Sequence, residues 1–413
     1  IINTNINTHE INWYPRCEIS GHKKMKKIIT SLLIIALITF CLGELAFRFF
    51  KPMPVYSTLK QHAGGFYKES EFNTFTLLEN YSGEFTNYDY YPAKIQVTTN
   101  SRGFRNTIPS INSEKKILIL GDSYTFGIHI KDENTYSSRL SKLINRKHEY
   151  EVINAGYANG YETDQQYSWF SNFIKNNGCP EIVILGFFLG NDFFVNQKYW
   201  KEKNNEGFPI KYIDENLYVD SKNFLRSKKK SIHTIATEAI YQIPILRESH
   251  LLIAVTRVIN KIELRIKGIG SGGWSFESFK FIYGDLDKNF LEREKIVINL
   301  INDMNQKTLK CKSNFITILL PISFMVNKDL FKKAFPDNDI SLFNDANYYD
   351  RLEKKLINLN INTLNIFSSM KHDFNLKGIN HFPNHGEVHF NSHGHNFTAE
   401  QIFNYLLKNK LIN

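Results

Sequence analysis

After residue 114, the hydrophobic and polar positions alternate between two patterns. Short apolar runs bounded by polar residues or glycine are typical of buried strands, and longer segments with apolar residues at helical spacing are typical of amphipathic helices. The strand candidates are Ile117–Leu120, Tyr150–Asn154, Ile182–Phe188, Phe315–Leu320 and Ile361–Phe367. The helix candidates between them are Asn134–Arg146, Asp164–Lys175, Phe290–Lys307 and Tyr348–Ile357. This alternation predicts a parallel sheet covered on both faces, in a flavodoxin-like α/β/α domain with strand order 2-1-3-4-5.

Residues 193–288 interrupt the alternation after the third strand. This insertion begins with polar sequence, contains a hairpin-like stretch at Pro209–Asp220 and continues with helical periodicity from Ser231 to Arg265. A glycine-rich stretch, Gly268–Gly273, lacks the Lys-Ser/Thr ending of a phosphate loop, so we expect no nucleotide site there. We favour a lid or docking surface over a separate domain for this insertion.

A long apolar run near the N-terminus predicts a membrane anchor. Ile28–Gly43 is almost wholly apolar, and Glu44–Phe50 extends it towards the roughly 20 residues that cross a bilayer. Four lysines precede the run and fewer basic residues follow, which places the N-terminus in the cytoplasm and the rest in the periplasm or outside the cell. No small-residue cleavage site follows, so we predict an uncleaved transmembrane signal-anchor over residues 25–50 of a bacterial inner membrane.

Two further segments flank this anchor. Residues 1–24 are polar and lack periodicity, so we interpret them as a non-native or disordered extension with Met25 as the biological start. Residues 51–113 are rich in Tyr, Phe, Asn and Thr with little periodicity, and we interpret them as a membrane-proximal stalk or cap. The remaining residues, 114–413, form the predicted α/β domain with its insertion.

Composition narrows the class of protein. The 413 residues are 42% hydrophobic and 22% charged, which is typical of a globular chain. The net charge of +10 is spread over many loops without a nucleic-acid motif, so we expect no nucleic-acid partner.

Cys179 and Cys311 precede the third and fourth strands, which are neighbours in the expected strand order. An extracytoplasmic location permits a disulfide between them, and two independent core residues are the alternative.

The expected strand ends carry residues suited to acyl transfer. The first strand ends in Gly121-Asp122-Ser123, the second leads to Gly160 and the third to Asn191-Asp192, while His389 lies near the C-terminus. Parallel strands share one carboxyl edge, so we expect these residues to meet there. Ser123 can act as nucleophile with His389 as its base. The Ser123 amide, the Gly160 amide and the Asn191 side chain can hold the oxyanion.

These blocks resemble the SGNH (GDSL-like) hydrolase family. The resemblance runs from NSRGFRN, which begins at Asn100, through GDSYTFG and the later blocks to the end of the chain. It implies a serine esterase or acyl-transfer enzyme that forms an acyl-Ser123 intermediate and needs no metal or organic cofactor. FFLGNDFF and the anchor ending in GELAFRFF resemble membrane-anchored members associated with bacterial surface polysaccharides. The implied substrate is an acylated glycan or a small ester.

The chain departs from the family pattern at several positions. Leu189 replaces the glycine of the Gly-x-Asn-Asp block, and Gly160 lies one residue later than expected, so Gly156 is an alternative oxyanion glycine. The family's aspartate three residues before the histidine is Gly386 here. We expect Glu387 to orient the histidine. The alternatives are Asp373 and a Ser–His dyad.

Simpler structural roles compete with these functional ones. Ser123 can be a helix N-cap, and Asn191-Asp192 can be an ordinary turn. Several histidines crowd the C-terminal segment, but Pro383, Gly386 and Gly394 break the helix that a metal site would need, so we predict no metal. We expect His393 and His395 to pack or cap around Gly394.

The favoured function is therefore an extracytoplasmic esterase that removes O-acetyl or other acyl groups from a glycan. An O-acetyltransferase acting on a surface polysaccharide and an inactive carbohydrate-binding or assembly protein are the alternatives.

Overall fold

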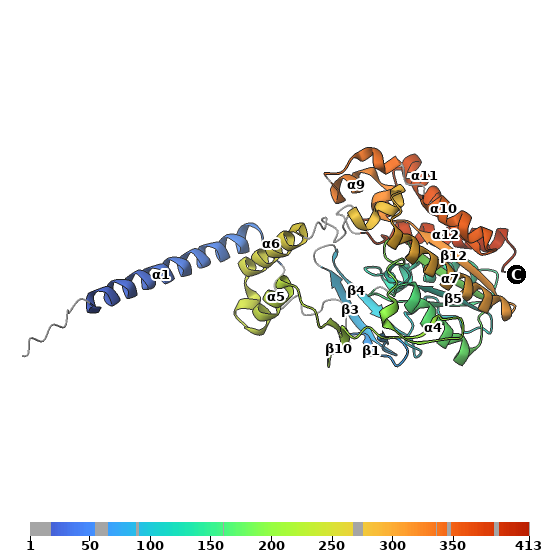
Figure 1. The fold of residues 1–413 in the computed structure, drawn as a ribbon, viewed down its shortest axis with the longest axis horizontal. Helices are drawn as coiled ribbons and strands as arrows, with labels where there is room; N and C mark the ends of the chain where they lie inside the picture. The colour runs from blue at the N-terminus through green and yellow to red at the C-terminus, as the bar shows by residue number, and fades with distance from the viewer. Residues whose placement is uncertain are drawn as a thin grey trace, which may run out of the picture. The chain divides into compact units, whose positions relative to one another are not determined.

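The computed structural model describes residues 18–53, 65–87, 91–159, 161–266, 276–335, 337–344, 348–383 and 388–412 (Figure 1). The chain forms two compact units: residues 1–57 with 237–258, and residues 58–236 with 259–413. The first unit contains the apolar N-terminal helix and part of the insertion. The second contains the sheet and all the predicted site residues that the structure describes.

The first unit is built around α1 (Glu18–Phe50), a helix of 33 residues. Its segment Lys24–Phe50 is long and apolar enough to cross a membrane. The insertion contributes residues 237–258, which include parts of α5 (Ile232–Gln242) and α6 (His250–Ile266). The helical character predicted for Ser231–Arg265 is confirmed, and it is divided between α5 and α6. Pro244 lies between the two helices, where it supplies no backbone N–H and disfavours helical backbone in the residue before it.

A five-stranded parallel sheet forms the core of the second unit, in the order β13-β12-β7-β5-β6. Numbered along the chain, this order is 2-1-3-4-5, so the predicted flavodoxin-like fold is confirmed. The strands coincide with the five predicted apolar runs to within three residues at each end: β5 (Lys116–Gly121), β6 (Glu151–Gly156), β7 (Ile182–Phe188), β12 (Asn314–Leu320) and β13 (Asn362–Asn365).

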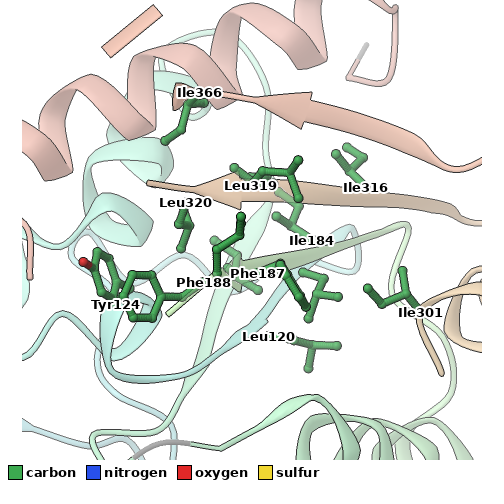
Figure 2. Close-up of a cluster of buried hydrophobic side chains, with 14 of the residues drawn as sticks. Leu120, Tyr124, Ile184, Phe187, Phe188, Ile301, Ile316, Leu319, Leu320 and Ile366 are labelled. Atoms are coloured by element: carbon green, nitrogen blue, oxygen red, sulfur yellow. The ribbon is translucent and has the colours of Figure 1, made fainter. Parts of the chain in front are cut away.

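Helices cover both faces of this sheet. On one face α4 packs against α7, and on the other α3 packs against α12, as right-handed crossovers require. Figure 2 shows Leu120, Ile184 and Phe187 of neighbouring strands in one cluster with Ile301 of α7. The main helices of this unit are α3 (Tyr136–Ile144), α4 (Thr163–Asn177), α7 (Lys288–Lys310), α10 (Tyr348–Asn358) and α12 (Ser392–Lys408). Shorter ones are α8 (Ser323–Val326), α9 (Lys328–Ala334) and α11 (Phe367–Lys377).

The segment expected to be a stalk or cap contains two antiparallel ribbons. They are β1 (Tyr67–Glu69) with β2 (Phe75–Leu77), and β3 (Ser82–Asn87) with β4 (Tyr91–Thr98). Tyr67 of β1 and Phe75 of β2 are buried in a second hydrophobic cluster. Phe66 in this segment stacks on Phe126, with ring centroids 5.6 Å apart.

The insertion begins with two further ribbons, and the hairpin predicted over Pro209–Asp220 is wrong. The two halves of that stretch pair with strands outside it: β8 (Trp200–Lys203) with β9 (Pro209–Tyr212), and β10 (Leu217–Val219) with β11 (Leu225–Ser227). The chain reverses instead at Gly207 and Asn223, which have φ of 86° and 62°. Such positive φ angles are typical of the tight turns that join antiparallel strands.

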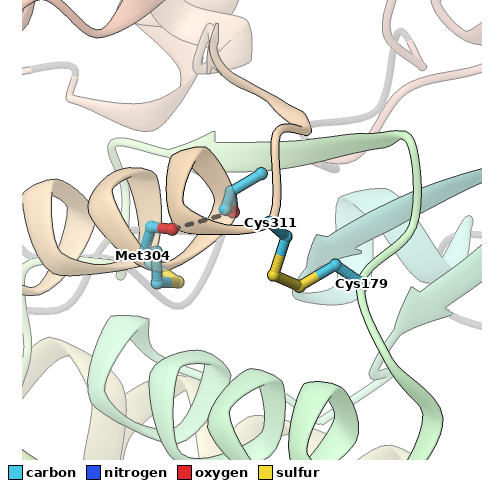
Figure 3. The surroundings of a disulfide bond; sticks show 4 residues. Cys179, Met304 and Cys311 are labelled. Atoms are coloured by element: carbon cyan, nitrogen blue, oxygen red, sulfur yellow. Dashed lines mark hydrogen bonds between the residues drawn. A yellow bond between two sulfur atoms is a disulfide. The ribbon is translucent and has the colours of Figure 1, made fainter.

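A disulfide joins the C-terminal ends of α4 and α7. Cys179 follows α4 and Cys311 follows α7, and their Cα atoms lie 6.1 Å apart (Figure 3). The structure therefore contains a disulfide bond between these cysteines rather than two independent core residues. The packing of α4 against α7 brings the two cysteines together.

Candidate active site

The turn after β5 presents Ser123 at the carboxyl edge of the sheet. Ser123 opens α2 (Ser123–Phe126), and it is half-buried while the three residues after it are buried. The N-cap is Asp122, whose Oδ1 accepts a hydrogen bond from the Tyr124 amide at 2.9 Å. The alternative in which Ser123 is only a helix cap is therefore wrong. A Cβ atom at Gly121 would lie 2.0 Å from Thr125 Oγ1, so this close turn requires glycine.

His389 lies in hydrogen-bond contact with Ser123, although 266 residues separate them in sequence. Ser123 Oγ and His389 Nε2 are 2.8 Å apart. Tyr124 packs against the histidine, with ring centroids 5.1 Å apart, and its hydroxyl donates to the carbonyl of Val388. The Tyr124 ring also stacks on Phe188, with ring centroids 4.1 Å apart. Tyr124 thus holds the His389 segment against the nucleophile turn, a role that the GDSYTFG motif alone does not indicate.

Asn391 fixes the same segment from its C-terminal side. Its side chain caps α12 by accepting a hydrogen bond from the Gly394 amide at 3.0 Å. Its amide group donates to the carbonyl of Asn380 at 2.7 Å, and its backbone N–H donates to that of His381 at 3.0 Å. His389 is therefore held between a tyrosine contact and a helix cap.

The acid expected behind His389 lies outside the described residues, because Glu387 belongs to the segment 384–387. Gly160, the expected oxyanion glycine, lies outside them too. Asp373, the alternative acid, is engaged elsewhere. Its Oδ2 lies 3.1 Å from His381 Nε2 and its Oδ1 lies 2.6 Å from Lys377 Nζ.

Asn191 follows β7 in a turn that Asp192 holds in place. The buried Asp192 carboxylate accepts hydrogen bonds from the Phe188 amide at 2.7 Å and from Gln166 Nε2 at 3.1 Å. Asn191 is left half-buried at the strand end, near the carboxyl group of Asp122. Burial raises the pKa of Asp122 to about 6, although the Tyr124 amide, His389 and the Asn191 side chain lower it.

Gly156, the alternative oxyanion glycine, has a packing role. Its amide is buried and donates to Asn154 Oδ1 at 3.0 Å. A Cβ atom at this position would lie 2.1 Å from the backbone nitrogen of Phe126. Glycine is therefore needed for β6 to end directly beneath α2, and the Gly156 amide is not directed at an incoming oxyanion.

Arg105 supports the loop that follows α2, a role that the sequence pattern does not indicate. Its side chain is fully buried, and its Nε donates to Asp132 Oδ1 at 2.9 Å. Its Nη1 donates to the carbonyls of Phe126 at 2.9 Å and Gly127 at 2.7 Å, while Nη2 donates to that of Ile130. Burial lowers the pKa of the guanidinium, whereas Asp132 raises it. NSRGFRN contains two arginines, Arg102 and Arg105, and nothing in this stretch indicates that Arg105 is the buried one.

His395 packs beneath the same loop in its neutral form. Its Nδ1 accepts a hydrogen bond from the Tyr136 amide at 3.1 Å, and the two rings stack at 5.9 Å. Burial, together with the neighbouring charges of Arg105 and Arg139, lowers its pKa to about 3. His395 also packs against Phe390, which lies beside Gly394, so the expected local packing is accompanied by a contact with α3.

Comparisons with known proteins were made by family model, by sequence and by structure. No family model and no curated protein matches the chain. Among solved structures, the chain is similar to the acetyl xylan esterase AlAXEase, with a TM-score of 0.35 and 14% identity over 70% of this chain and 98% of that chain. It is also similar to a catalytic mutant of an acetylxylan esterase from Geobacillus stearothermophilus (TM-score 0.34, 12% identity, 72% of this chain and 96% of that chain). A psychrotrophic esterase from Pseudoalteromonas sp. matches with TM-score 0.33 and 9% identity over 71% of this chain and 98% of that chain.

These TM-scores are below 0.5, so the class of protein rests on the chain's own geometry. The sheet has the flavodoxin-like strand order, with the serine of GDSYTFG directly after β5 and Asn191 after β7. His389 precedes α12 and meets that serine. The chain has an SGNH hydrolase-like fold.

Proposed function

We propose that this protein is a serine esterase in which Ser123 is the nucleophile and His389 is the general base. The observation that carries the proposal is the 2.8 Å contact between Ser123 Oγ and His389 Nε2 at the carboxyl edge of the sheet. This distance is within the reach needed for direct proton transfer. A serine that merely capped a helix would need no histidine beside it.

The reaction proceeds in two acyl-transfer steps. His389 Nε2 takes the Ser123 hydroxyl proton while Oγ attacks the ester carbonyl, and the resulting tetrahedral intermediate carries the charge on its former carbonyl oxygen. The Ser123 and Gly160 amides and the Asn191 side chain are the proposed donors to that oxygen. Collapse expels the alcohol, which takes the proton from His389 and leaves an acyl-Ser123 ester. Water then attacks this ester with His389 again as base, releasing the acid.

Glu387 is the proposed orienting acid for His389. It lies two residues before the histidine, and a carboxylate there can fix the imidazole tautomer and stabilise the imidazolium that forms. Asp373 is less suited to this role, since both of its oxygens are already paired with basic side chains.

We further propose that the esterase faces the periplasm or cell exterior and removes O-acetyl or other acyl groups from a glycan. The FFLGNDFF and GELAFRFF segments resemble those of membrane-anchored SGNH members associated with bacterial surface polysaccharides, and this resemblance supports the glycan substrate. The apolar helix at Lys24–Phe50 and the lysines before it support the membrane anchor and its orientation. The Cys179–Cys311 disulfide supports an oxidising compartment.

Hydrolysis of p-nitrophenyl acetate by the full chain in detergent tests the enzyme assignment. We expect Ser123→Ala to reduce the rate to background and His389→Ala to lower kcat/KM by roughly 10²–10⁴-fold. His393→Ala is the control, because His393 is exposed on the same C-terminal segment. A Ser123→Ala variant that keeps the wild-type rate would exclude the mechanism. Adding an oligosaccharide and following the acetyl group then separates transfer from hydrolysis.

A further inference from the structure

A cavity of about 240 Å³ lies in the second unit, between the β1–β2 ribbon and α4. The ribbon contributes Phe72 and neighbouring residues, and α4 contributes its C-terminal half, from Trp169 to Asn177. Since α4 begins at Thr163 near the catalytic edge and rises 1.5 Å per residue, Trp169 and Asn177 lie about 9 and 21 Å further along it. Of the site residues that the structure describes, none lines this cavity: Ser123, Asn191 and His389. The cavity is therefore separate from the catalytic site.

One wall of the cavity is aromatic. Trp169 and Phe173, one turn apart on α4, stack with their ring centroids 5.1 Å apart and their planes at 16°. Both side chains are half-buried, and Phe72 is 44% exposed. The buried Phe104 contacts both α4 rings edge-on, with centroids 5.9 Å from Trp169 and 6.2 Å from Phe173. The wall is thus fixed by packing and offers apolar ring surface to a ligand.

Two asparagines of α4 add hydrogen-bond acceptors to this lining. Asn172 Nδ2 donates to the carbonyls of Ser168 at 2.9 Å and Ile210 at 3.0 Å. Asn177 Nδ2 donates to the carbonyl of Phe173 at 3.0 Å. Within the part of the chain that the structure describes, neither amide oxygen accepts a hydrogen bond. Both oxygens are therefore available as acceptors for a ligand.

The remaining polar groups give the cavity little net charge. Among the described residues that line it, Arg102 alone is charged, and its guanidinium pairs with Glu151 at the surface. Ser70 Oγ accepts hydrogen bonds from the amides of Phe72 and Asn73, which leaves its O–H as a donor. Amide oxygens disfavour a carboxylate or phosphate, and the paired arginine does not offset them. The lining is therefore suited to a neutral ligand whose groups both donate and accept.

A sugar ring has these properties, since its C–H face can pack on aromatic rings while its hydroxyls donate to amide oxygens and accept from a serine. The volume is below the roughly 300–1,000 Å³ of pockets that hold drug-sized ligands, so the cavity is suited to about one such ring. We propose that this cavity binds one pyranose ring of a neutral glycan chain, at a site separate from the catalytic edge. The ligand class agrees with the proposed substrate, but the inference does not depend on the esterase chemistry.

Calorimetric titration of the full chain with Ser123→Ala, which prevents turnover, tests the proposal in a detergent without a sugar headgroup. The probes are β-1,4-linked hexamers of glucose, N-acetylglucosamine and xylose. We expect saturable binding of at least one hexamer, and Phe72→Ala should weaken it by about tenfold. Phe72→Tyr keeps the ring and should retain the affinity. Tyr218→Ala is the control, because Tyr218 of β10 is 38% exposed and does not line the cavity.

Failure of all three neutral hexamers to bind would overturn the inference, and so would an affinity that Phe72→Ala leaves unchanged. Tighter binding of the anionic galacturonate hexamer would overturn the assignment to neutral glycans. With Ser123 intact, Phe72→Ala should hydrolyse p-nitrophenyl acetate at the wild-type rate, and near-UV circular dichroism checks that the variant is folded. A wild-type chain that binds a hexamer through Phe72 but does not hydrolyse the ester would contradict the proposed function and leave this inference standing.

Discussion

Replacement of Arg105 by methionine should destabilise the second unit far more than any exposed arginine would. The substitution keeps a long apolar stem but removes the partner of Asp132 and of three backbone carbonyls. Both members of the ion pair are buried, with side-chain exposures of 0% and 6%. Breaking such a pair leaves an uncompensated charge and costs about 3–5 kcal/mol. The three backbone carbonyls also lose their hydrogen-bond donor, which lowers the stability further.

Thermal unfolding of the full chain in detergent, followed by near-UV circular dichroism at neutral pH, measures this effect. At about 2–4 °C per kcal/mol, the expected fall in Tm is roughly 10 °C. Arg102→Met is the control: Arg102 lies three residues away in the same segment, but its side chain is 41% exposed and pairs with Glu151 at the surface. Such a pair contributes about 1 kcal/mol or less. Equal Tm shifts for the two variants would refute the assignment of Arg105 as the internal support of the loop after α2.

Three other residues give further predictions. Asn191→Ala should lower kcat for p-nitrophenyl acetate by about 10²–10³-fold through loss of an oxyanion donor, with KM little changed. Glu387→Gln should lower kcat by roughly 10²–10⁴-fold, since a neutral amide no longer stabilises the imidazolium. His395 has a pKa of about 3 in the folded protein against 6.5 when unfolded, so the unfolded chain alone takes up its proton as pH falls below 6.5. Unfolding free energy should therefore fall by about 2 kcal/mol between pH 8 and pH 5, and His395→Gln should remove that part of the loss.

Each of these has a result that would contradict it. An unchanged kcat in Asn191→Ala would remove the side chain from the oxyanion site, and an unchanged kcat in Glu387→Gln would leave a Ser–His dyad. Urea unfolding at the two pH values measures the His395 effect, with His393→Gln as the exposed control on the same helix. The same pH dependence in wild type and His395→Gln would show that another group is responsible.

The sheet could be predicted from the sequence because its strands are buried on both faces. Runs such as Ile182–Phe188 are continuously apolar, and all seven residues of β7 are buried. The continuous apolar character and the short length of such runs identify them as buried strands. The meeting of Ser123 with His389 was likewise foreseeable, since parallel strands bring their carboxyl ends to one edge.

The supporting contacts could not be predicted, because they depend on tertiary partners far away in sequence. Nothing in the local sequence distinguishes Arg105, which is fully buried, from Arg102, which is exposed. Tyr124 contacts Val388 across 264 residues. The incorrect hairpin at Pro209–Asp220 has the same origin: its two halves have strand-like sequence, but the turns at Gly207 and Asn223 decide their partners.

Covalent trapping of the nucleophile is the direct test of the role proposed for Ser123. The full chain is treated with a fluorophosphonate probe, and the modified residue is identified by mass spectrometry of the peptides. We expect one adduct, on Ser123, with no labelling of Ser123→Ala and strongly slowed labelling of His389→Ala. A wild-type protein that stays unlabelled, or that carries its adduct on another serine, would exclude Ser123 as the nucleophile.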